Sequence, residues 1–396
     1  MKILVTGGAG FIGSSLVRHL IHEMDWQVVN VDKLTYAANE RALDTVSGKS
    51  AYHFEQTDIC DAVAIREVLK KHQPDAIIHM AAESHVDRSI DVPAKFIQTN
   101  IVGTYTLLDA TLAYWRALPD SPPGLKPFAD IPVPVRDKAT SLLQDFSTSA
   151  LPNSPTSRLQ HSRTPALPNS KTSPLPPSPT KSGFRFLHIS TDEVYGALGN
   201  QGDFKETSPY RPNSPYSASK AAADHLVRAW SQTYGLPTLQ TNSSNNYGPW
   251  QHEEKLIPRM VSRALAGERL PVFGSGQQVR DWIHVDDHAR AITQVLLHGQ
   301  PGDSYNIGAN CEIENLEIVR IICETLDALI KEKPNGITNF SEIIQHVDDR
   351  QGHDFRYALN TEKIRNELSW SPSIDFTTGL RETIQFLVQQ SRANAR

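Results

Sequence analysis

Short runs of consecutive apolar residues alternate along the first half of the chain with longer segments whose apolar positions recur every three or four residues. The runs have the length of buried strands, and the segments have the periodicity of helices that bury one face. The predicted strands cover residues 2–6, 27–31, 51–56, 76–80, 184–189 and 238–242. The predicted helices cover residues 13–24, 62–71, 92–114 and 216–234. This alternation of strands and helices predicts an α/β fold with a doubly wound parallel sheet.

The pattern changes to shorter elements after Trp250. We predict helices at 255–266, 316–330 and 376–389, a strand at 270–273, and a strand end that leads into a helix over 283–297. We therefore expect two units. Residues 1–250 form the sheet domain, and residues 251–396 form a smaller lobe over its carboxyl edge, with segments that can cross back to the sheet.

The strand–helix alternation stops between Leu118 and Phe184. This segment holds 14 of the 26 prolines of the chain, mixed with serine, threonine and asparagine. Such a composition buries too little apolar surface to offset the entropy lost on ordering, and loops beyond about 15 residues are uncommon in compact domains. We expect residues 119–183 to be a disordered insertion at the amino edge of the sheet, remote from the ligand edge. A segment that docks on a partner as a polyproline II helix is the alternative.

The bulk properties narrow the class of protein. The 396-residue chain is long enough for a large core, and a net charge of −5 without a basic run argues against a nucleic-acid partner. The three cysteines form no CxxC pair and the histidines lack metal-ligand spacing, so we expect no metal site. The chain start lacks the features of a signal peptide, and no apolar stretch reaches the roughly 18 residues that span a membrane. We expect a cytoplasmic protein with no membrane contact.

A glycine-rich turn joins the first predicted strand to the first predicted helix. In this context glycines let a dinucleotide pyrophosphate approach the amino end of the helix, as in Rossmann-like folds. The expected contacts to the cofactor from this turn are Gly7, Gly10, Phe11, Ile12 and Gly13. Asp32 ends the second strand about 20 residues later, where a carboxylate bonds the ribose hydroxyls and repels a 2′-phosphate. The predicted cofactor is therefore NAD and not NADP.

Two further positions complete the predicted NAD site. Asp58 and Ile59 follow the third strand on the adenine side, although an aspartate there can instead cap a helix. Ala81 and Ala82 follow the fourth strand, and their small side chains leave room for the nicotinamide ribose.

Two pairs of residues carry the predicted chemistry. Tyr216 and Lys220 are four residues apart, so they share one helical face. A free tyrosine has a pKa of about 10, and a nearby ammonium lowers it, which suits removal of a proton from an alcohol while a hydride leaves the same carbon. Asp192 and Glu193 add an acid–base couple that alcohol oxidation does not need, which points to elimination. A solvated pair at a helix start is the alternative for the two carboxyls.

Longer segments around these residues permit a comparison with known families: 7–13, 81–89, 190–196, 216–220, 244–249, 254–258, 280–282 and 349–354. They resemble, in the same order, segments of the extended short-chain dehydrogenase/reductase family. Within it they are most similar to the dTDP-glucose 4,6-dehydratases. The resemblance covers nearly the whole chain outside the proline-rich insertion.

The resemblance implies NAD-dependent conversion of dTDP-glucose to dTDP-4-keto-6-deoxyglucose. In the implied roles, Tyr216 takes the C4 hydroxyl proton, and Thr191 bonds the C4 oxygen. Lys220 holds Tyr216 near its working pKa and bonds the nicotinamide ribose. Glu193 then acts as base at C5, while Asp192, held protonated, acts as acid toward the C6 hydroxyl.

The resemblance also implies the substrate contacts. Ser84 and His85 are expected near the glucose. Residues expected to bind the nucleotide are Asn245, Lys255, Leu256, Arg263, Arg280, Asn315, Arg350 and His353. Arg280 and Arg350 suit a diphosphate because a guanidinium forms bidentate bonds to phosphate oxygens.

The family usually forms homodimers through a four-helix interface, so a homodimer is expected. Leu226, Val227 and Trp230 could supply its apolar stripe, but the same stripe could equally pack on the sheet.

Two other functions stay open from the sequence. Another nucleotide-sugar member of the family, such as a 4-epimerase, a decarboxylase or a dehydratase for a different nucleotide, would share most motifs. An epimerase needs no acid–base pair for dehydration, so Asp192 and Glu193 argue against it. An NAD-sensing regulator of the same fold could dispense with the pair formed by Tyr216 and Lys220.

Overall fold

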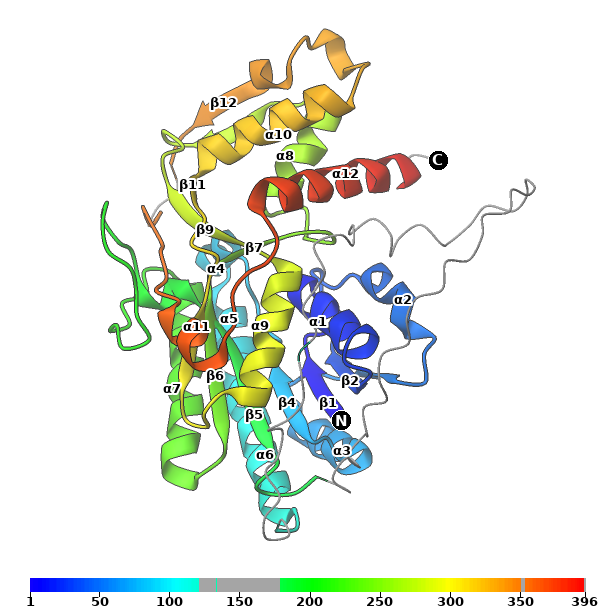
Figure 1. Cartoon of the computed structure of the whole chain (residues 1–396), viewed down its shortest axis with the longest axis vertical. Coiled ribbons are helices and arrows are strands. Elements are labelled where there is room, and N and C mark those ends of the chain that lie inside the picture. Colours follow the sequence, from blue (N-terminus) through cyan, green and yellow to red (C-terminus); the bar gives the residue numbers. More distant parts are fainter. Residues whose placement is uncertain (121–132, 134–178, 350–352, 395–396) are drawn as a thin grey trace, which may run out of the picture.

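The computed structural model describes residues 1–120, 133, 179–349 and 353–394, and its core is a seven-stranded sheet (Figure 1). The strand order is β10–β6–β5–β4–β1–β2–β3, and every neighbouring pair is parallel. The strands are β1 (Lys2–Thr6), β2 (Gln27–Asp32), β3 (Tyr52–Gln56), β4 (Ala76–His79), β5 (Arg185–Thr191), β6 (Thr238–Ser243) and β10 (Ser304–Ile307). The α/β fold with a doubly wound parallel sheet is confirmed.

Helices cover both faces of this sheet. One face carries α1 (Phe11–His22), α9 (Val285–His298) and α11 (Glu362–Leu368), and the other carries α3 (Ala62–His72), α6 (Thr104–Ala117) and α7 (Pro215–Tyr234). Successive side chains of a strand point to opposite faces. Ile3 and Val5 therefore join the core under α1 and α9, while Leu4 joins the core under α3 and α6.

The segment predicted as one helix over 92–114 consists of several pieces. They are α4 (Val86–Asp91), α5 (Pro93–Phe96), the π-helical segment η2 (Ile97–Gly103) and α6. The residue before a proline is disfavoured in the helical region, which explains the break at Val92. The side chain of Asn100, within η2, accepts from the Glu83 amide at 2.8 Å and donates to Ser219 Oγ at 2.8 Å. The π-helical turn thus ties the loop after β4 to α7, and π-helical turns are frequent at functional sites.

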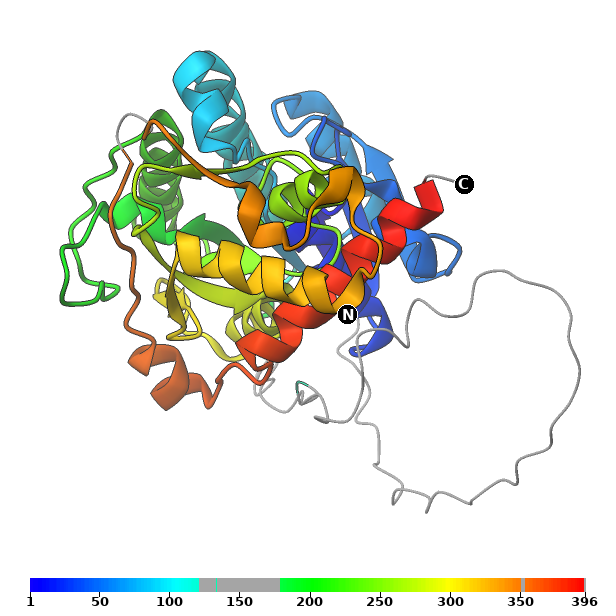
Figure 2. The ribbon, with the colours of Figure 1, turned by 90° about the horizontal axis from the view of Figure 1, so that it is seen from above.

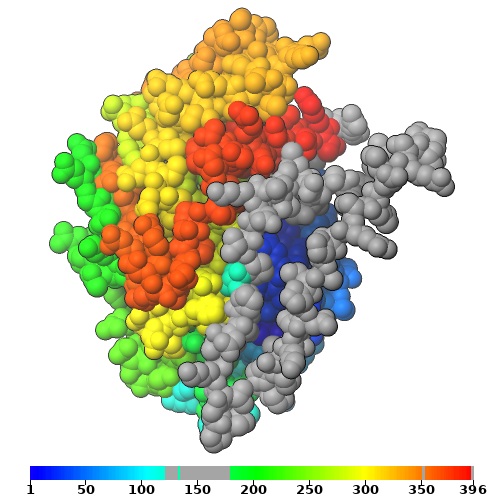
Figure 3. Space-filling model, viewed as in Figure 1, coloured from blue at the N-terminus to red at the C-terminus, as the bar shows by residue number. Residues whose placement is uncertain are grey.

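A smaller lobe lies over the carboxyl ends of the sheet strands, at the top of Figure 1. It contains a sheet of order β11–β9–β7, a parallel pair of β12 and β8, and its own apolar core. Figure 2 shows α10 and α12 running across this lobe, and in Figure 3 its orange and red segments form the top of the visible face. Its elements are β7 (Asn245–Tyr247), α8 (Leu256–Leu265), β8 (Leu270–Phe273), β9 (Val279–His284), β11 (Glu312–Glu314), α10 (Asn315–Leu329), η5 (Pro334–Gly336), η6 (Phe340–Ile343), β12 (Ile344–Val347) and α12 (Phe376–Asn394).

Part of the chain after residue 250 returns to the large sheet. Strand β10 pairs with β6, and α9 packs against α1 on the face of that sheet. The sequence allowed for such crossing, and the boundary at residue 250 stays a prediction. Short helical turns complete the described chain: η1 (Glu40–Leu43), α2 (Asp44–Ser47) and η4 (Asp192–Tyr195).

The predicted disordered insertion, residues 119–183, lies mostly outside the described residues, so its disorder stays a prediction. Its described ends meet at the amino edge of the sheet: the Lys181 amide donates to the Pro119 carbonyl at 3.0 Å, and Lys181 pairs with Asp120 at 3.3 Å. Strand β5 begins at Arg185, opposite Ala76 at the start of β4.

Deletion of residues 121–178, closed by a short glycine–serine linker, is expected to leave kcat within about twofold of the full-length value, because ligands bind such sheets at the opposite, carboxyl edge. The two chain ends already lie together, so a short linker closes the gap without moving β5. Steady-state kinetics of the two proteins check this. A folded, NAD-binding deletion protein with little activity would show that the insertion contributes to the chemistry.

Candidate active site

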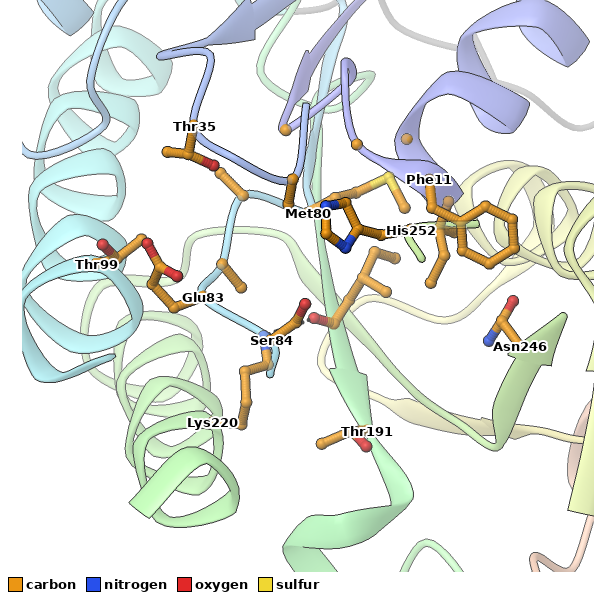
Figure 4. Close-up of a pocket in the computed structure, with 18 of the residues that line it drawn as sticks. Phe11, Thr35, Met80, Glu83, Ser84, Thr99, Thr191, Lys220, Asn246 and His252 are labelled. Carbon is orange, nitrogen blue, oxygen red and sulfur yellow. Dashed lines mark hydrogen bonds between the residues drawn. The ribbon is translucent and has the colours of Figure 1, made fainter. Parts of the chain in front are cut away.

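A cavity of about 290 Å³ runs along the carboxyl edge of the sheet, where the strand order reverses between β1 and β4. Dinucleotides bind doubly wound sheets at this place. Figure 4 shows Thr35 and Phe11 toward one end of the cavity and Thr191 and Lys220 toward the other. The cavity brings together most residues predicted for NAD: Gly7, Gly10, Phe11, Ile12, Gly13, Asp32, Ile59, Ala81, Ala82, Tyr216 and Lys220.

The glycine-rich turn fits a dinucleotide because side chains are excluded there. Gly7 has a φ of +75°, and a Cβ on it would lie 2.7 Å from the Ala81 amide nitrogen. A Cβ on Gly13 would lie 2.1 Å from the Gly7 carbonyl oxygen. The turn therefore keeps its backbone close to the start of α1, as a pyrophosphate site requires.

Asp32 ends β2 with its carboxylate at the cavity wall. One oxygen accepts from the Ala9 amide at 3.0 Å and the other from the Leu34 amide at 2.8 Å. Burial raises the pKa of Asp32, and the two amide hydrogen bonds oppose that rise. A fixed carboxylate in this place suits ribose hydroxyls and disfavours a 2′-phosphate, so the residues present fit NAD.

Asp58 differs from its neighbours in that it is absent from the cavity lining. Its carboxylate accepts from the Cys60 amide at 2.9 Å and from Lys33 Nζ at 3.4 Å. Asp58 thus orders the loop before α3 and does not cap that helix, whose N-cap is Asp61, so its predicted contact to the cofactor stays a prediction. Ile59, beside it, does line the cavity.

Tyr216 and Lys220 lie on the first turns of α7 and are 9% and 5% exposed. Ser214 caps this helix, and its hydroxyl accepts from the Ser217 amide at 3.0 Å. Lys220 Nζ donates to the Ile189 carbonyl at 2.8 Å, and burial lowers the pKa of Lys220 to about 8.

The pKa of Tyr216 is raised, whereas the sequence predicted a lowered pKa. Burial is the main cause, followed by the negative charge of Glu193, while Thr191 opposes the rise by hydrogen bonding. The Lys220 ammonium is turned to the Ile189 carbonyl, and this explains why the expected lowering does not occur in the protein alone.

Asp192 and Glu193 begin η4 directly after β5, and both line the cavity with Thr191. Asp192 is 2% exposed, and its Oδ1 accepts from Thr191 Oγ1 at 3.2 Å. Its Oδ2 is buried and has no hydrogen-bond partner among the described residues. Burial and then the charge of Glu193 raise the pKa of Asp192 well above its usual value. This environment favours the protonated form of Asp192.

A second cavity of about 190 Å³ continues from the first into the smaller lobe. Glu193, Asn245 and Lys255 line both cavities, so the two meet at Glu193. Ser84 lines only the first cavity, and its carbonyl accepts from Lys255 Nζ at 3.1 Å. The second cavity also gathers these residues predicted for the substrate: His85, Leu256, Arg280, Asn315 and His353.

Arg280 reaches this cavity from β9 although only 5% of it is exposed. Its guanidinium donates to the carbonyls of Val279 and Asp354 at 2.8 and 2.9 Å and lies over the ring of Tyr357. His353 lies near it, with Nδ1 2.6 Å from Asp349 Oδ1. Arg350 lies outside the described residues, so its predicted role stays untested.

The two arginines of α8 differ in whether they line a cavity. Arg263, which was predicted to bind the nucleotide, is absent from the lining of both cavities. It donates to the Arg269 carbonyl at 2.6 Å and pairs with Glu268 at 3.4 Å. Arg259, one helical turn earlier, lines the second cavity, and its guanidinium has no hydrogen bond or ion pair within the described part of the chain. Sequence reasoning missed Arg259, whose position in the first turn of α8 was the available signal.

Arg259→Ala is expected to raise the KM for the substrate about tenfold with kcat nearly unchanged, because a hydrogen bond to a charged group contributes about 1.5–3 kcal/mol of binding. Arg263→Ala is the matched control on the same helix and should leave KM unchanged. Steady-state kinetics check both. Equal effects of the two substitutions would contradict a substrate contact by Arg259.

The described residues contain no group of three or more His, Cys, Asp or Glu side chains arranged to hold a metal ion. They also contain no helix that is both long and apolar enough to cross a membrane.

Comparisons with known proteins agree with this geometry. The GDP-mannose 4,6 dehydratase family matches residues 4–121 and 177–383. A dTDP-glucose 4,6-dehydratase of Escherichia coli is 47% identical over 395 residues, covering 98% of this chain and 93% of that protein. The dTDP-glucose 4,6-dehydratase of Haemophilus influenzae is also 47% identical over 395 residues, covering all of both chains.

A solved structure extends the agreement to the fold. DesIV, a dTDP-glucose 4,6-dehydratase from Streptomyces venezuelae crystallised with NAD, superposes with a TM-score of 0.76 at 36% identity, covering 99% of this chain and 98% of that one. The family match spans most of the chain, and the identity to full-length relatives is far above the level at which the fold alone is shared. The chain therefore belongs to the GDP-mannose 4,6 dehydratase family and, within it, to the dTDP-glucose 4,6-dehydratases.

Proposed function

We propose that the chain converts dTDP-glucose to dTDP-4-keto-6-deoxyglucose with NAD as its cofactor. The observation that carries this proposal is the junction of the two cavities. There the buried acid Asp192 stands beside Glu193, on the wall that also carries Tyr216 and Lys220. NAD, held by the residues of the first cavity, would supply the hydride acceptor for C4 of the sugar and the hydride donor for C6.

Oxidation at C4 requires a base for the hydroxyl proton. Tyr216 takes this proton, and a positive charge on Lys220 stabilises the phenolate that forms. Thr191 lies on the same wall and holds the C4 oxygen by a hydrogen bond. Burial raises the pKa of Tyr216, so a positive charge beside the phenol favours loss of its proton.

Elimination requires an acid and a base with separated pKa values. The C4 ketone makes the C5 proton acidic, and Glu193, which lines both cavities, removes it. Asp192 gives its proton to the C6 hydroxyl, which leaves as water. The roles follow from burial, because the buried carboxyl of Asp192 favours its protonated form while Glu193 is only partly buried where the two cavities meet.

The nucleotide of the substrate is assigned to the second cavity. Arg280 and Arg259 give this cavity two guanidinium groups, and guanidinium is suited to a diphosphate. A sugar at the Glu193 junction would then lie between the nucleotide and the nicotinamide.

Incubation of the purified protein with dTDP-glucose tests the proposal. The expected product is a 4-keto-6-deoxy sugar, detected by the absorbance that such ketones develop in alkali and identified by NMR. UDP-glucose is the matched control and should react far more slowly. Formation of a C4 epimer, or a clear preference for UDP-glucose, would replace the proposal with another nucleotide-sugar enzyme.

We further propose that the chain forms a homodimer in the cytoplasm. Its three cysteines are free, which suits a reducing compartment. Of the predicted stripe, Val227 is buried against the sheet, and Leu226 and Trp230 are half-buried beside it. Large apolar side chains are instead exposed along η2 and the neighbouring helix ends, as a helix–helix interface would require: Ile97 (53%), Tyr105 (48%) and Tyr234 (42%).

Ile97→Glu combined with Tyr105→Glu is expected to convert the dimer to a monomer, because two buried charges would face the partner helix. Phe54→Glu is the control, since Phe54 is 37% exposed on β3, the edge strand at the far end of the large sheet from α7. Sedimentation velocity measures the outcome. A wild-type protein that sediments as a monomer at micromolar concentration would rule out the homodimer.

A further inference from the structure

Behind the catalytic pair lies a buried carboxyl group that the mechanism above does not use. Asp224 follows Lys220 by four residues and Tyr216 by eight, so the three side chains lie along one face of α7. Asp224 is 2% exposed and is absent from the lining of both cavities. It can therefore influence the reaction only through another residue.

The Asp224 carboxylate is fixed by β5 and by the loop before α7. Ser190 Oγ donates to Oδ2 at 2.7 Å, and His188 Nε2 lies 3.0 Å from Oδ1. The Tyr210 hydroxyl adds a further hydrogen bond. Burial raises the pKa of Asp224 to about 6, while the charge of Lys220 and these hydrogen bonds oppose the rise. Asp224 is therefore mostly ionised at pH 7 and above.

Lys220 needs such a charge nearby. Burial lowers its pKa, and the negative charge of Asp224 is the interaction that acts against this lowering. Among the described residues, His79 and His188 are the other basic side chains behind the site. Burial lowers the pKa of both well below the usual value, with further lowering of His79 by His188 and Lys220 and of His188 by Lys220, which favours their neutral forms. His225 is exposed on α7 and lines neither cavity, and its charge is the smallest of the effects that lower the pKa of Asp224.

Asp224 also acts on Tyr216, where its negative charge opposes formation of the phenolate. A negative charge near a phenol raises its pKa, and Asp224 contributes to the raised pKa of Tyr216. Its contribution there follows those of burial, Glu193 and Asp192, whereas on Lys220 it is the only charge effect resolved. We therefore expect the main influence of Asp224 on the reaction to come from its effect on the charge of Lys220.

We propose that Asp224 is a positioning residue for the reaction, whose fixed carboxylate is the counter-ion that keeps the Lys220 ammonium charged. A charged Lys220 stabilises the Tyr216 phenolate and donates to a ribose hydroxyl. A neutral amine stabilises the phenolate poorly. Only the kinetic test of this proposal depends on the function proposed above. The Asp224–Lys220 coupling itself can be measured without substrate.

Asp224→Asn tests the proposal with little change of shape. The alkaline limb of the kcat–pH profile is expected to move about one pH unit toward acid, with kcat about fivefold lower at pH 8 and nearly unchanged at pH 6. Asp224→Glu, which restores the charge, should move the limb back. A kcat lowered equally at all pH values, with the limb in place, would show a structural role and overturn the proposal.

Two further measurements keep the test independent of folding and of substrate. In protein with 13C-labelled lysine side chains, the NMR titration of Lys220, assigned by its absence in Lys220→Met, should shift to lower pH in Asp224→Asn. This readout distinguishes a failure of the coupling from a failure of the proposed function. Lys220→Met/Asp224→Asn leaves no buried charge unpaired and should be as active as Lys220→Met alone. An unshifted Lys220 titration, or a further loss of activity in the double variant, would contradict the proposal.

Discussion

A protein that carries both Asp192→Asn and Glu193→Gln is expected to oxidise dTDP-glucose at C4 and then to stop before water is lost. Neither substitution touches Tyr216 or Lys220, and both replacements keep the shape of the original side chain. The pair can no longer remove the C5 proton or protonate the C6 hydroxyl, and each such function contributes about 10²–10⁴-fold. Product formation should fall at least about 10³-fold, while reduced nicotinamide accumulates on the enzyme and is measured by its absorbance after rapid mixing.

The single variants separate the two roles. Asp192→Asn should still exchange the C5 hydrogen with deuterium from solvent, because Glu193 remains a base at the junction of the cavities. Glu193→Gln should retain the C5 hydrogen. Mass spectrometry of recovered sugar measures the exchange. The opposite pattern would exchange the roles of the two carboxyls, and normal dehydration by the double variant would remove both from the mechanism.

The fold was predictable from sequence where strands are buried on both faces. The apolar runs of β1 and β5 locate these strands to within two residues because both faces pack against helices. Strand β10 carries no such run, since its Asn306 is a polar residue at the core. Asn306 can be buried there because it accepts from the Tyr195 hydroxyl at 3.0 Å and donates to the Phe204 carbonyl at 2.9 Å. These partners are about 100 residues away in sequence, and no local pattern shows them.

The site was predictable where chain topology alone brings residues together. Asp192 at the end of β5 and Tyr216 at the start of α7 meet because both lie at the carboxyl edge of one sheet. The sequence did not show which residues of a helix border a cavity. Arg259 and Arg263 share a face of α8, but only the first turn of that helix borders the second cavity. The direction of the pKa shift of Tyr216 was also inaccessible, since it depends on burial and on the distance to Glu193.

Tyr216→Phe is expected to abolish oxidation itself, in contrast to the carboxyl variants. The substitution removes one buried hydroxyl and leaves the ring in contact with Phe96. Without a base for the C4 hydroxyl proton, hydride transfer would produce a protonated ketone, so kcat should fall about 10²–10⁴-fold. No reduced nicotinamide should appear after rapid mixing, although NAD and substrate still bind, as calorimetry with dTDP would confirm.

Tyr195→Phe is the matched control, because Tyr195 is as deeply buried but lines neither cavity. Its hydroxyl donates to Asn306 Oδ1 at 3.0 Å, so its loss should cost about 1 kcal/mol of stability and leave kcat close to the wild-type value. The wild-type oxidation rate should rise with pH while Lys220 remains charged, since the raised pKa of Tyr216 leaves the phenol protonated at neutral pH. Tyr216→Phe should lose this rise together with the rate. Rapid formation of reduced nicotinamide in Tyr216→Phe would assign the base to another group, and Glu193, the anion on the cavity wall with the largest effect on the pKa of Tyr216, is the first candidate.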